Sequence, residues 1–344
     1  ILASVKSLLI VFLMCLAGCD NLRQTQVLFA PGKEKNIACY RIPALVTSRD
    51  GDLIAVCDQR VPTCADLNGN RDINIVMRTS PDNGENWSEI RTIVDYPEGR
   101  SASDPSMITD RLTGTIFLFF NYMDHDQEKG FYYLRVTKST DNGKTWSTPE
   151  DITDQITKPD WHGDFKFITS GRGMQTKSGK LVHTLVNLQK GLHLFGSDDH
   201  GRSWYLLDVP ITPGDESKVI ELADGTWMVN SRGNGAGHRY VHLSADEGKT
   251  WVTHAEAGLA DPGCNASLIR EGNVLFFSNP NCTDQRKNLA LRISTDGGKT
   301  WGEGSTVHAG NSAYSSMTFI PGKGIGLLYE RNDYREIVFT RINP

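Results

Sequence analysis

Ser80-Pro81-Asp82-Asn83-Gly84-Glu85-Asn86-Trp87 is the first of five copies of one turn, Ser-x-Asp-x-Gly-x-x-Trp. The other copies run from Ser139 to Trp146, from Ser197 to Trp204, from Ser244 to Trp251 and from Ser294 to Trp301. Their spacing, roughly 47 to 59 residues, is typical of internal repeats that build propellers or solenoids. A single copy is an ordinary Asp-Gly turn, but five copies in register indicate one repeated structural unit.

Each fixed residue of the turn has a chemical reason. The Asp accepts hydrogen bonds from backbone N–H groups of its own turn, the Gly supplies a positive φ, and the Trp covers both. Runs rich in β-branched and aromatic residues precede the turns, for example at residues 73–77, 132–136 and 289–293. We therefore expect each turn to be the tip of a hairpin that joins two strands of one repeat.

Length and composition favour one closed all-β ring. The chain has 344 residues, of which 38% are hydrophobic and 33 are glycine, and repeats of this kind cannot bury their faces separately. The formal net charge of -5 gives no reason to expect a nucleic-acid partner. Beyond the N-terminal segment, no stretch is long and apolar enough to span a bilayer.

The N-terminal segment is typical of an export signal. Lys6 precedes an apolar run of about ten residues that ends in Leu16-Ala17-Gly18-Cys19. This ending resembles a bacterial lipoprotein signal, in which the Cys is lipidated; the alternative is a plain secretory signal. We expect a signal peptide at 1–18, a tether at 19–35 and one propeller domain at 36–344, in an exported protein anchored to the membrane by acyl chains on Cys19.

The remaining cysteines are Cys39, Cys57, Cys64, Cys264 and Cys282. An exported protein can form disulfides, but an odd number leaves at least one thiol free. Cys264 and Cys282 flank an expected hairpin, 266–270 and 274–278, so they can form a cross-strand bridge or remain as free, buried thiols. No His/Cys group has the spacing of metal ligands, and we expect no metal.

Three arginines stand at the ends of apolar runs: Arg41 in Tyr40-Arg41-Ile42-Pro43, Arg232 in Asn230-Ser231-Arg232-Gly233, and Arg286 after Asn279. A buried guanidinium is costly without an anionic partner. Each arginine alone is explained by a structural salt bridge. If the three converge at one end of the ring, a substrate carboxylate is a suitable shared partner, because it accepts bidentate hydrogen bonds.

Together these motifs resemble the sialidase (neuraminidase) superfamily. The five turns resemble its Asp-boxes, and Arg41-Ile42-Pro43 resembles its Arg-Ile-Pro motif, within a similarity that extends from about residue 37 to residue 330. The resemblance implies a six-bladed β-propeller of four-stranded antiparallel blades. Only five boxes are visible, and the strands expected at 326–329 and 336–339 are candidates to close the ring.

The resemblance also implies the residues that bind substrate. Arg41, Arg232 and Arg286 correspond to the arginines that grip the carboxylate of sialic acid, and Glu330 to the carboxylate that holds the first of them. Arg60 and Asp104 fall where the family contacts hydroxyl groups of the sugar. The expected partners are therefore sialylated glycans.

The implied catalytic residues are Asp66 as acid/base, Glu216 as the partner of the nucleophile, and Tyr314 as the nucleophile. A neutral tyrosine avoids repulsion from the substrate carboxylate, and sialidases use tyrosine where other glycosidases use a carboxylate. Glu216 would take the phenol proton, while the arginines would favour the phenolate. We expect Asp66 to lie in a loop away from the arginines, which would keep its pKa from falling.

Several of these residues have a rival or a purely structural explanation. Asp72 is the rival of Asp66, Asp215 is the rival of Glu216, and Tyr314 can be a packing residue of the last repeat. Trp161 and His162 can shape the leaving-group side, although loop aromatics are more often packing residues. The segment 171–175 has two glycines around Arg172, but no helix follows, so we interpret it as a turn at a strand start.

The sequence therefore predicts a retaining exo-α-sialidase that needs no metal or organic cofactor. A trans-sialidase or intramolecular trans-sialidase would share every residue named above. A sialic-acid-binding propeller without turnover would need the arginines but not Asp66, Glu216 and Tyr314. A purely structural Asp-box propeller would not bring the three arginines together.

Overall fold

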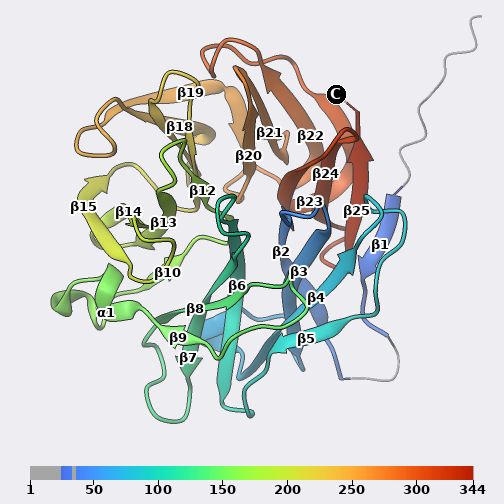
Figure 1. Ribbon diagram of the computed structural model, residues 1–344. Coiled ribbons are helices and arrows are strands. Elements are labelled where there is room, and N and C mark those ends of the chain that lie inside the picture. Colours follow the sequence, from blue (N-terminus) through green and yellow to red (C-terminus); the bar gives the residue numbers. More distant parts are fainter. Residues whose placement is uncertain (1–24, 33–35, 344) are drawn as a thin grey trace, which may run out of the picture.

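The computed structural model describes residues 25–32 and 36–343. The predicted signal peptide and Cys19 lie outside the described residues. The described chain is almost entirely β-structure, and its sheets are arranged around a common centre like the blades of a propeller (Figure 1). The helical segments are short: η1 (Leu67–Gly69), α1 (Thr153–Ile156) and η2 (Pro159–Trp161). The predicted all-β class and propeller-like arrangement are confirmed.

Four separate sheets make up the first two-thirds of the ring. The first contains β2 (Cys39–Thr47), β3 (Leu53–Val61), β4 (Asp72–Ser80) and β5 (Arg91–Val94). The second contains β6 (Arg100–Thr109), β7 (Ile116–Asp124), β8 (Tyr133–Ser139) and β9 (Glu150–Asp151), with the short β11 (Gly171–Arg172) added in parallel to β6.

The third and fourth sheets follow the same antiparallel order. The third contains β10 (Lys166–Ile168), β13 (Leu181–Asn187), β14 (Gly191–Ser197) and β15 (Tyr205–Ile211), with β12 (Met174–Gln175) paired to β13. The fourth contains β16 (Ser217–Glu221), β17 (Trp227–Ser231), β18 (Gly237–Ser244) and β19 (Val252–Asp261). The segment 171–175 thus forms two short strands, and its interpretation as a turn is wrong.

The fifth sheet has seven strands and joins the two ends of the described chain. It contains β20 (Ser267–Glu271), β21 (Val274–Pro280), β22 (Lys287–Ser294), β23 (Ser305–Ile320), β24 (Gly324–Arg331), β25 (Glu336–Ile342) and β1 (Thr25–Phe29). Pairing of β1 with β25 closes the ring. A tether that reaches residue 35 is therefore wrong in part, because Thr25–Phe29 are a strand whose Leu28 and Phe29 are buried.

The repeated turns join the third and fourth strands in each sheet that carries one. In the first copy, the Asn86 N–H donates to Asp82 Oδ1 at 2.9 Å, and this bond, with those from the Asn86 amide and the Ser80 hydroxyl, lowers the pKa of Asp82 to about 2. β25 and β1, at the end of the seven-stranded sheet, lie at opposite ends of the chain, so no turn joins them. This connectivity explains why no sixth copy exists there.

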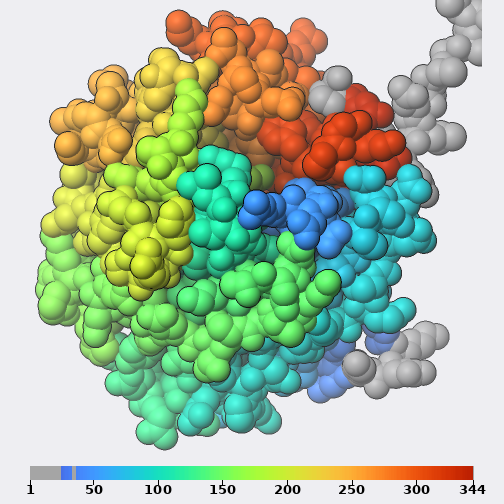
Figure 2. Space-filling view, in the orientation of Figure 1, coloured from blue at the N-terminus to red at the C-terminus, as the bar shows by residue number. Residues whose placement is uncertain are grey.

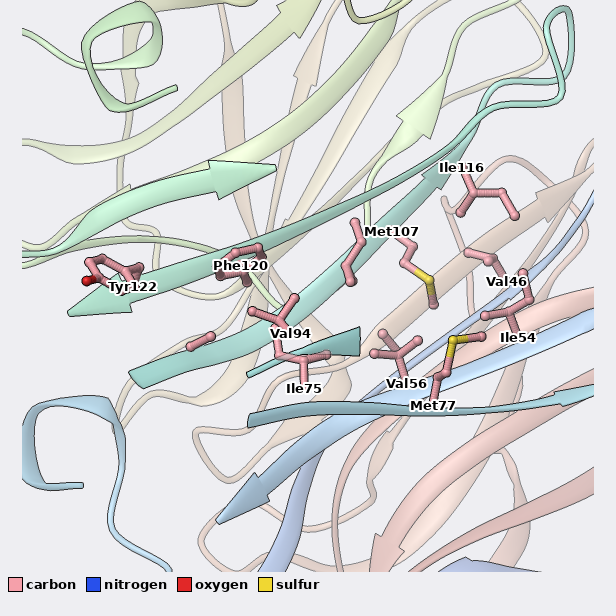
Figure 3. Close-up of a cluster of buried hydrophobic side chains, with 13 residues drawn as sticks. Val46, Ile54, Val56, Ile75, Met77, Val94, Met107, Ile116, Phe120 and Tyr122 are labelled. Atoms are coloured by element: carbon pink, nitrogen blue, oxygen red, sulfur yellow. The ribbon is translucent and has the colours of Figure 1, made fainter. Parts of the chain in front are cut away.

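Glycine is required in the turns because the turns close against the neighbouring sheet. A Cβ at Gly84, where φ is 85°, would collide with the ring of Phe339, and one at Gly201 would collide with the ring of Phe117. Between the sheets lie apolar cores such as the one in Figure 3, where Val56, Ile75 and Phe120 are fully buried. The repeat thus supplies both the hairpin and the contact that stacks one sheet on the next.

Three inner strands are irregular at one end of the ring. The register shifts between Arg41 and Ala44 in β2, between Ser103 and Ser106 in β6, and between Ser312 and Ser315 in β23. These strands are neighbours, since the Leu45 N–H donates to Ser316 Oγ and Thr109 Oγ1 donates to the Thr47 carbonyl. Bulges redirect side chains and are frequent beside active sites.

Of the two alternatives left open for Cys264 and Cys282, the structure supports free thiols. The disulfide joins Cys39 and Cys64, and Cys57, Cys264 and Cys282 are free. The hairpin of β20 and β21 exists as predicted, but Cys264 lies in the loop before β20, where its N–H donates to Asp261 Oδ1 at 3.0 Å. Cys282 Sγ instead donates to Asp284. In the part of the chain that the structure describes, no helix is long and apolar enough to cross a membrane.

Candidate functional site

Tyr314 lies in the bulge of β23 and points toward the start of β16. Its hydroxyl donates to Glu216 Oε2 at 2.7 Å, and both side chains are buried. Asp215, the predicted rival of Glu216, instead accepts hydrogen bonds from the Glu216 N–H and from the Asn234 amide. Two residues that are 98 positions apart in the sequence thus form a phenol–carboxylate pair of the geometry that proton transfer requires.

Three guanidinium groups surround this pair. Arg41 and Arg286 lie 5.6 and 5.3 Å from the centre of the Tyr314 ring, and Arg232 Nη1 donates to Glu216 Oε2 at 2.6 Å. The structure therefore brings Arg41, Arg232 and Arg286 together, although they come from three different sheets or sheet junctions. Such a cluster of positive charge favours an anionic ligand.

Glu330 on β24 holds the first arginine and the backbone beside it. Its carboxylate accepts from Arg41 Nε at 2.7 Å and Arg41 Nη2 at 3.4 Å, from the Ile42 N–H at 2.8 Å and from the Tyr314 N–H at 3.1 Å. Ile42 has φ 63°, a left-handed conformation that is costly for a β-branched residue. The hydrogen bond to Glu330 helps to offset that cost, so the carboxylate positions both halves of the site.

Arg60 on β3 is buried and joins two carboxylates. It donates through Nε and Nη2 to Asp58 Oδ2 at 3.2 and 3.0 Å, and through Nη1 to Asp66 Oδ1 at 2.7 Å. Asp58 is fully buried, whereas 84% of the Asp66 side chain is exposed. Asp66 lies just before η1, in the loop that follows the disulfide-bonded Cys64.

The expectation that Asp66 lies away from the arginines is therefore wrong. Burial raises the pKa of its carboxyl, but the charge and hydrogen bond of Arg60, with the charges of Arg41 and Arg286, outweigh burial. The pKa of Asp66 consequently lies below its ordinary value of 3.8. The loop places the carboxylate at the edge of the cluster, where an arginine of the adjacent strand reaches it.

Asp104 lies in the bulge of β6 with φ 61°. Its N–H donates to Asp58 Oδ1 at 3.0 Å, and its carboxylate accepts from the Asn121 amide at 3.0 Å. Burial and the negative charge of Asp58 raise the pKa of Asp104 to about 7, against the opposing charge of Arg60. Arg60 and Asp104 thus lie near each other through the shared partner Asp58.

The arginines do not make Tyr314 a phenolate. Burial is the largest influence on its pKa, and together with the charge of Glu216 it raises the pKa well above 10; Arg232 and Arg286 act in the opposite direction but do not prevail. The resting side chain is a neutral phenol. Its proton can therefore leave only as another bond forms, with Glu216 as the acceptor.

A cavity of about 240 Å³ opens above these residues. Asp66, Asp104, Glu216, Arg232 and Tyr314 line one part of it. Its remaining wall contains Asp215 but is mainly apolar, made by Ile42, Leu67, Tyr132, Phe165, Phe167 and Leu188. Polar groups that converge beside an apolar wall are typical of a small-molecule site.

The rival of Asp66 and the two loop aromatics differ from Asp66 in position. Asp72 begins β4, accepts from the Asn74 amide and does not line the cavity, whereas Asp66 does. Trp161 is 2% exposed within an apolar core and does not line the cavity. The ring of His162 packs against Phe131 and Tyr133. Both aromatic residues of that loop therefore have packing roles.

Sequence reasoning missed two residues of the site. Asp58 is two positions before Arg60 on β3, so both side chains lie on one face of that strand. This spacing could have identified Asp58 as a partner of Arg60. Tyr334 lies in the β24–β25 turn, where its ring covers the Arg41 guanidinium at 3.9 Å and its hydroxyl accepts from Arg286 Nη1 at 3.2 Å. No local pattern marks Tyr334, because its partners are distant in sequence.

Residues that could hold a metal are not grouped in the described chain. Among residues 25–32 and 36–343, no set of three or more His, Cys, Asp or Glu side chains is arranged to bind a metal ion. The donors in the site are mostly guanidinium groups, which attract anions rather than cations.

Comparison with known proteins agrees with this geometry. Residues 51–326 match the family described as the BNR repeat-like domain. A sialidase from Micromonospora viridifaciens is 34% identical over 354 residues, which cover 91% of this chain and 53% of that protein. A sialidase from Bacteroides fragilis is 32% identical, with coverage of 86% and 61%. The chain therefore spans less than two-thirds of the length of either relative.

Solved structures share the fold. The Hadza microbial sialidase Hz136 superposes with a TM-score of 0.80 at 31% identity, over 88% of this chain and 65% of that chain. A leech intramolecular trans-sialidase superposes with a TM-score of 0.78 at 19% identity, over 93% and 70%, and supports the fold alone. The chain therefore belongs to the family of BNR repeat-like domains and is related to bacterial sialidases.

Proposed function

We propose that the protein is a retaining exo-α-sialidase that removes terminal sialic acid from glycans through a tyrosyl-enzyme intermediate. The observation that carries this proposal is the 2.7 Å bond from the Tyr314 hydroxyl to Glu216 in the centre of three arginines. The relation to proteins named sialidases supports the same activity. A binding module needs the arginines, but it has no use for a buried phenol paired with a general base.

The arginines explain the use of a tyrosine. The carboxylate of sialic acid lies on the reacting carbon, and Arg41, Arg232 and Arg286 would bind it and offset its charge. A carboxylate nucleophile would be repelled there, whereas the neutral Tyr314 is not. As the bond from the Tyr314 oxygen to the anomeric carbon forms, the phenol proton passes to Glu216 and the glycosidic bond breaks.

Asp66 supplies the proton that the departing sugar oxygen needs. In the unliganded protein the positive charges of Arg60, Arg41 and Arg286 hold the pKa of Asp66 low. A bound substrate carboxylate would neutralise part of that charge and raise the pKa of Asp66, so that protonation follows binding. In the second step the ionised Asp66 activates a water that releases the sugar from Tyr314.

The direct test is turnover of a fluorogenic sialoside, with identification of the released sugar. Tyr314→Phe should lower kcat at least 100-fold while sialic acid still binds; a rate like that of the unmodified protein would contradict the nucleophile assignment. Tyr205→Phe is the matched control, because its hydroxyl donates to Asp198 at 3.0 Å outside the site. Free sialic acid as product supports hydrolysis, whereas an anhydro or transferred sugar would identify a trans-sialidase.

We also infer that the ring has six blades, with the seven-stranded sheet counted as two blades that share β23. The first part of this 16-residue strand pairs with β22 and the last part with β24. Residues of β20–β22 such as Phe276 pack face to face with Leu327 and Val338 of β24 and β25, as separate blades do. Proteolysis within 305–312 that leaves both halves bound would support this count; immediate unfolding would argue for one continuous sheet.

We further propose that the protein is exported and anchored by lipid on Cys19, with a tether that ends before β1. The sequence up to Cys19 supports this proposal. Cys19→Ala should release the protein from membranes and abolish incorporation of labelled fatty acid. Labelled fatty acid in the Cys19→Ala protein would refute the anchor.

A further inference from the structure

The segment 169–175 runs through the centre of the ring rather than around it. β11 lies parallel to β6, with Gly171 opposite Ser106 and Arg172 opposite Met107, and β12 then pairs with β13. Arg172 Nη1 donates to the Met317 carbonyl of β23 at 2.8 Å. The segment therefore carries an arginine across the centre, from one inner strand to another.

This arginine lies at the end of the ring opposite Tyr314. β2 has Arg41 near its first residue and Thr47 at its last, a separation of roughly 20 Å along an extended strand. Arg172 lines cavities with Thr47, Ser48 and Phe319, at the far ends of β2 and β23. Figure 2 looks onto this end of the molecule, with the turns 48–52 (blue), 110–115 (teal) and 176–180 (lime) around its centre.

Two adjoining cavities meet at this end, with volumes of about 360 and 280 Å³. Arg111 and Arg172 line both of them, whereas Arg49 lines the first and Arg270 the second. Four guanidinium groups therefore surround one hollow. Together they form what we name the far-end cluster: Arg49, Arg111, Arg172 and Arg270.

No carboxylate forms an ion pair with the far-end cluster within the described residues. Arg111 donates to the carbonyls of Gln175 and Thr176, and Arg270 to the carbonyl of Gly272. Throughout residues 25–32 and 36–343, none of the four arginines lies within 4.0 Å of an acidic oxygen. Burial and the charge of Arg111 lower the pKa of Arg172 to about 10, which reflects the cost of an uncompensated cation there.

The nearest acids are engaged elsewhere. Asp110 accepts from His200 Nδ1 at 2.7 Å, from the Gln175 amide at 2.7 Å and from the Thr113 hydroxyl at 2.9 Å. Glu221 lines the second cavity, and its carboxylate accepts from the Lys177 N–H at 2.6 Å. Glu221 keeps its negative charge at the edge of the second cavity, but neither acid forms an ion pair with any of the four arginines, so four cations face at most one anion in the hollow.

We propose that the far-end cluster binds an oxyanion: a carboxylate, sulfate or phosphate group held between Arg111 and Arg172. Guanidinium groups bind such anions through paired N–H donors, and a bound anion would remove the repulsion between the two arginines. The site is separate from the one around Tyr314 and does not depend on the proposed sialidase activity.

The first test is thermal unfolding of the full chain in inorganic phosphate, with sodium chloride used to keep the ionic strength constant. Arg172→Met and Arg111→Gln should each weaken the phosphate dependence of the melting temperature at least tenfold in apparent Kd. Arg341→Gln is the matched control, since Arg341 pairs with an exposed Glu85. Equal phosphate responses of Arg111→Gln, Arg341→Gln and the unmodified protein would overturn the proposal.

A second measurement needs no variant, in case Arg172→Met does not fold. Crystals of the unmodified protein soaked in selenate should show anomalous density beside Arg111 and Arg172, and density only around Tyr314 would overturn the site. Repeating the thermal unfolding with glucuronate in place of phosphate distinguishes a sugar carboxylate from a free inorganic anion as the ligand. Tighter binding of glucuronate indicates an acidic sugar, whereas tighter binding of phosphate indicates a free inorganic anion.

Discussion

Arg41 on β2 and Arg60 on the neighbouring β3 each pair with a carboxylate, and the two pairs differ in how firmly the carboxylate is held. In the pair of Arg41 and Glu330 the side chains are 10% and 0% exposed, whereas in the pair of Arg60 and Asp66 the arginine is buried and the aspartate is 84% exposed. The bond lengths are the same, 2.7 Å in each. Exposure, rather than bond length, therefore separates a fixed counter-ion from a carboxylate that can change its partner.

The hydrogen-bond partners of each carboxylate also show that Glu330 is held firmly and Asp66 is not. Glu330 also accepts from the Ile42 and Tyr314 N–H groups, so its loss would leave four donor groups of three residues without their partner. Asp66 accepts from Arg60, which keeps a second, buried carboxylate in Asp58. Loss of the bond to Asp66 thus leaves Arg60 compensated by Asp58, so Asp66 can exchange its partner.

Of the substitutions in these two pairs, Glu330→Ala should have the largest effect on stability. It leaves the buried Arg41 without a counter-ion, which costs about 3–5 kcal/mol of unfolding free energy, and it also loosens Ile42 and Tyr314. Urea denaturation measures the first effect, and turnover of a sialoside the second. A change below about 1 kcal/mol would mean that the buried pair is not structural.

Asp66→Asn should separate activity from stability. We expect kcat/KM for a sialoside with an unactivated leaving group to fall about 100- to 10,000-fold, as for loss of a general acid. The unfolding free energy should change by less than about 0.5 kcal/mol, because exposed ion pairs contribute little. A leaving group that needs no proton should restore most of the rate; an equal loss with both substrates would contradict the acid role.

The sequence predicts some features of the site and not others, because some are local in the chain and others depend on tertiary packing. The five turns and the strands before them are local features, so the repeat, the propeller-like ring and the positions of Arg41, Glu216 and Tyr314 follow from pattern and family resemblance. The contact of Arg60 with Asp66, the Cys39–Cys64 disulfide and the position of Tyr334 depend on how loops pack over the ring. Such packing leaves no periodic trace in the sequence.

The same reason explains the errors. Thr25–Phe29 follow a segment of export-signal character, but their partner β25 lies more than 300 residues away. The pKa of Tyr314 was expected to be lowered by arginines, yet burial of the ring in β23 prevails. Burial is a tertiary property, and the charges visible in a sequence do not reveal its size.

The pH dependence of kcat/KM should test whether Asp66, the exposed member of the pair with Arg60, donates a proton. Because the pKa of Asp66 lies below 3.8, the carboxyl is almost fully ionised in the free protein at pH 7. Its protonated fraction rises about tenfold for each unit that the pH falls. The ratio of kcat/KM between the unmodified protein and Asp66→Asn should rise between pH 7 and pH 5; a ratio that stays flat would exclude Asp66 as the proton donor.

The pH effect on folding should be small and of a defined sign. A pKa lowered by folding stabilises the native state above the unfolded pKa, and the contribution disappears as the pH falls through the folded pKa. For Asp66 this loss would occur below about pH 4, and solvent screening keeps it slight. Acid denaturation of Asp66→Asn should therefore follow that of the unmodified protein closely.

Tyr334→Phe should give the smallest change in activity. It tests whether Tyr334, whose ring covers Arg41, also helps to hold the pair of Arg41 and Glu330. The substitution keeps the ring 3.9 Å above Arg41 but removes the hydroxyl that accepts from Arg286 at 3.2 Å. One hydrogen bond of this kind corresponds to about a two- to tenfold effect, which we expect in KM rather than kcat because Arg286 would bind the substrate carboxylate. Tyr334→Leu also removes the ring over Arg41 and should raise KM further. If Tyr334→Phe and Tyr334→Leu both leave KM unchanged, the rigidity of the Arg41 site comes from Glu330 alone, and the contrast between the two pairs rests on a single carboxylate.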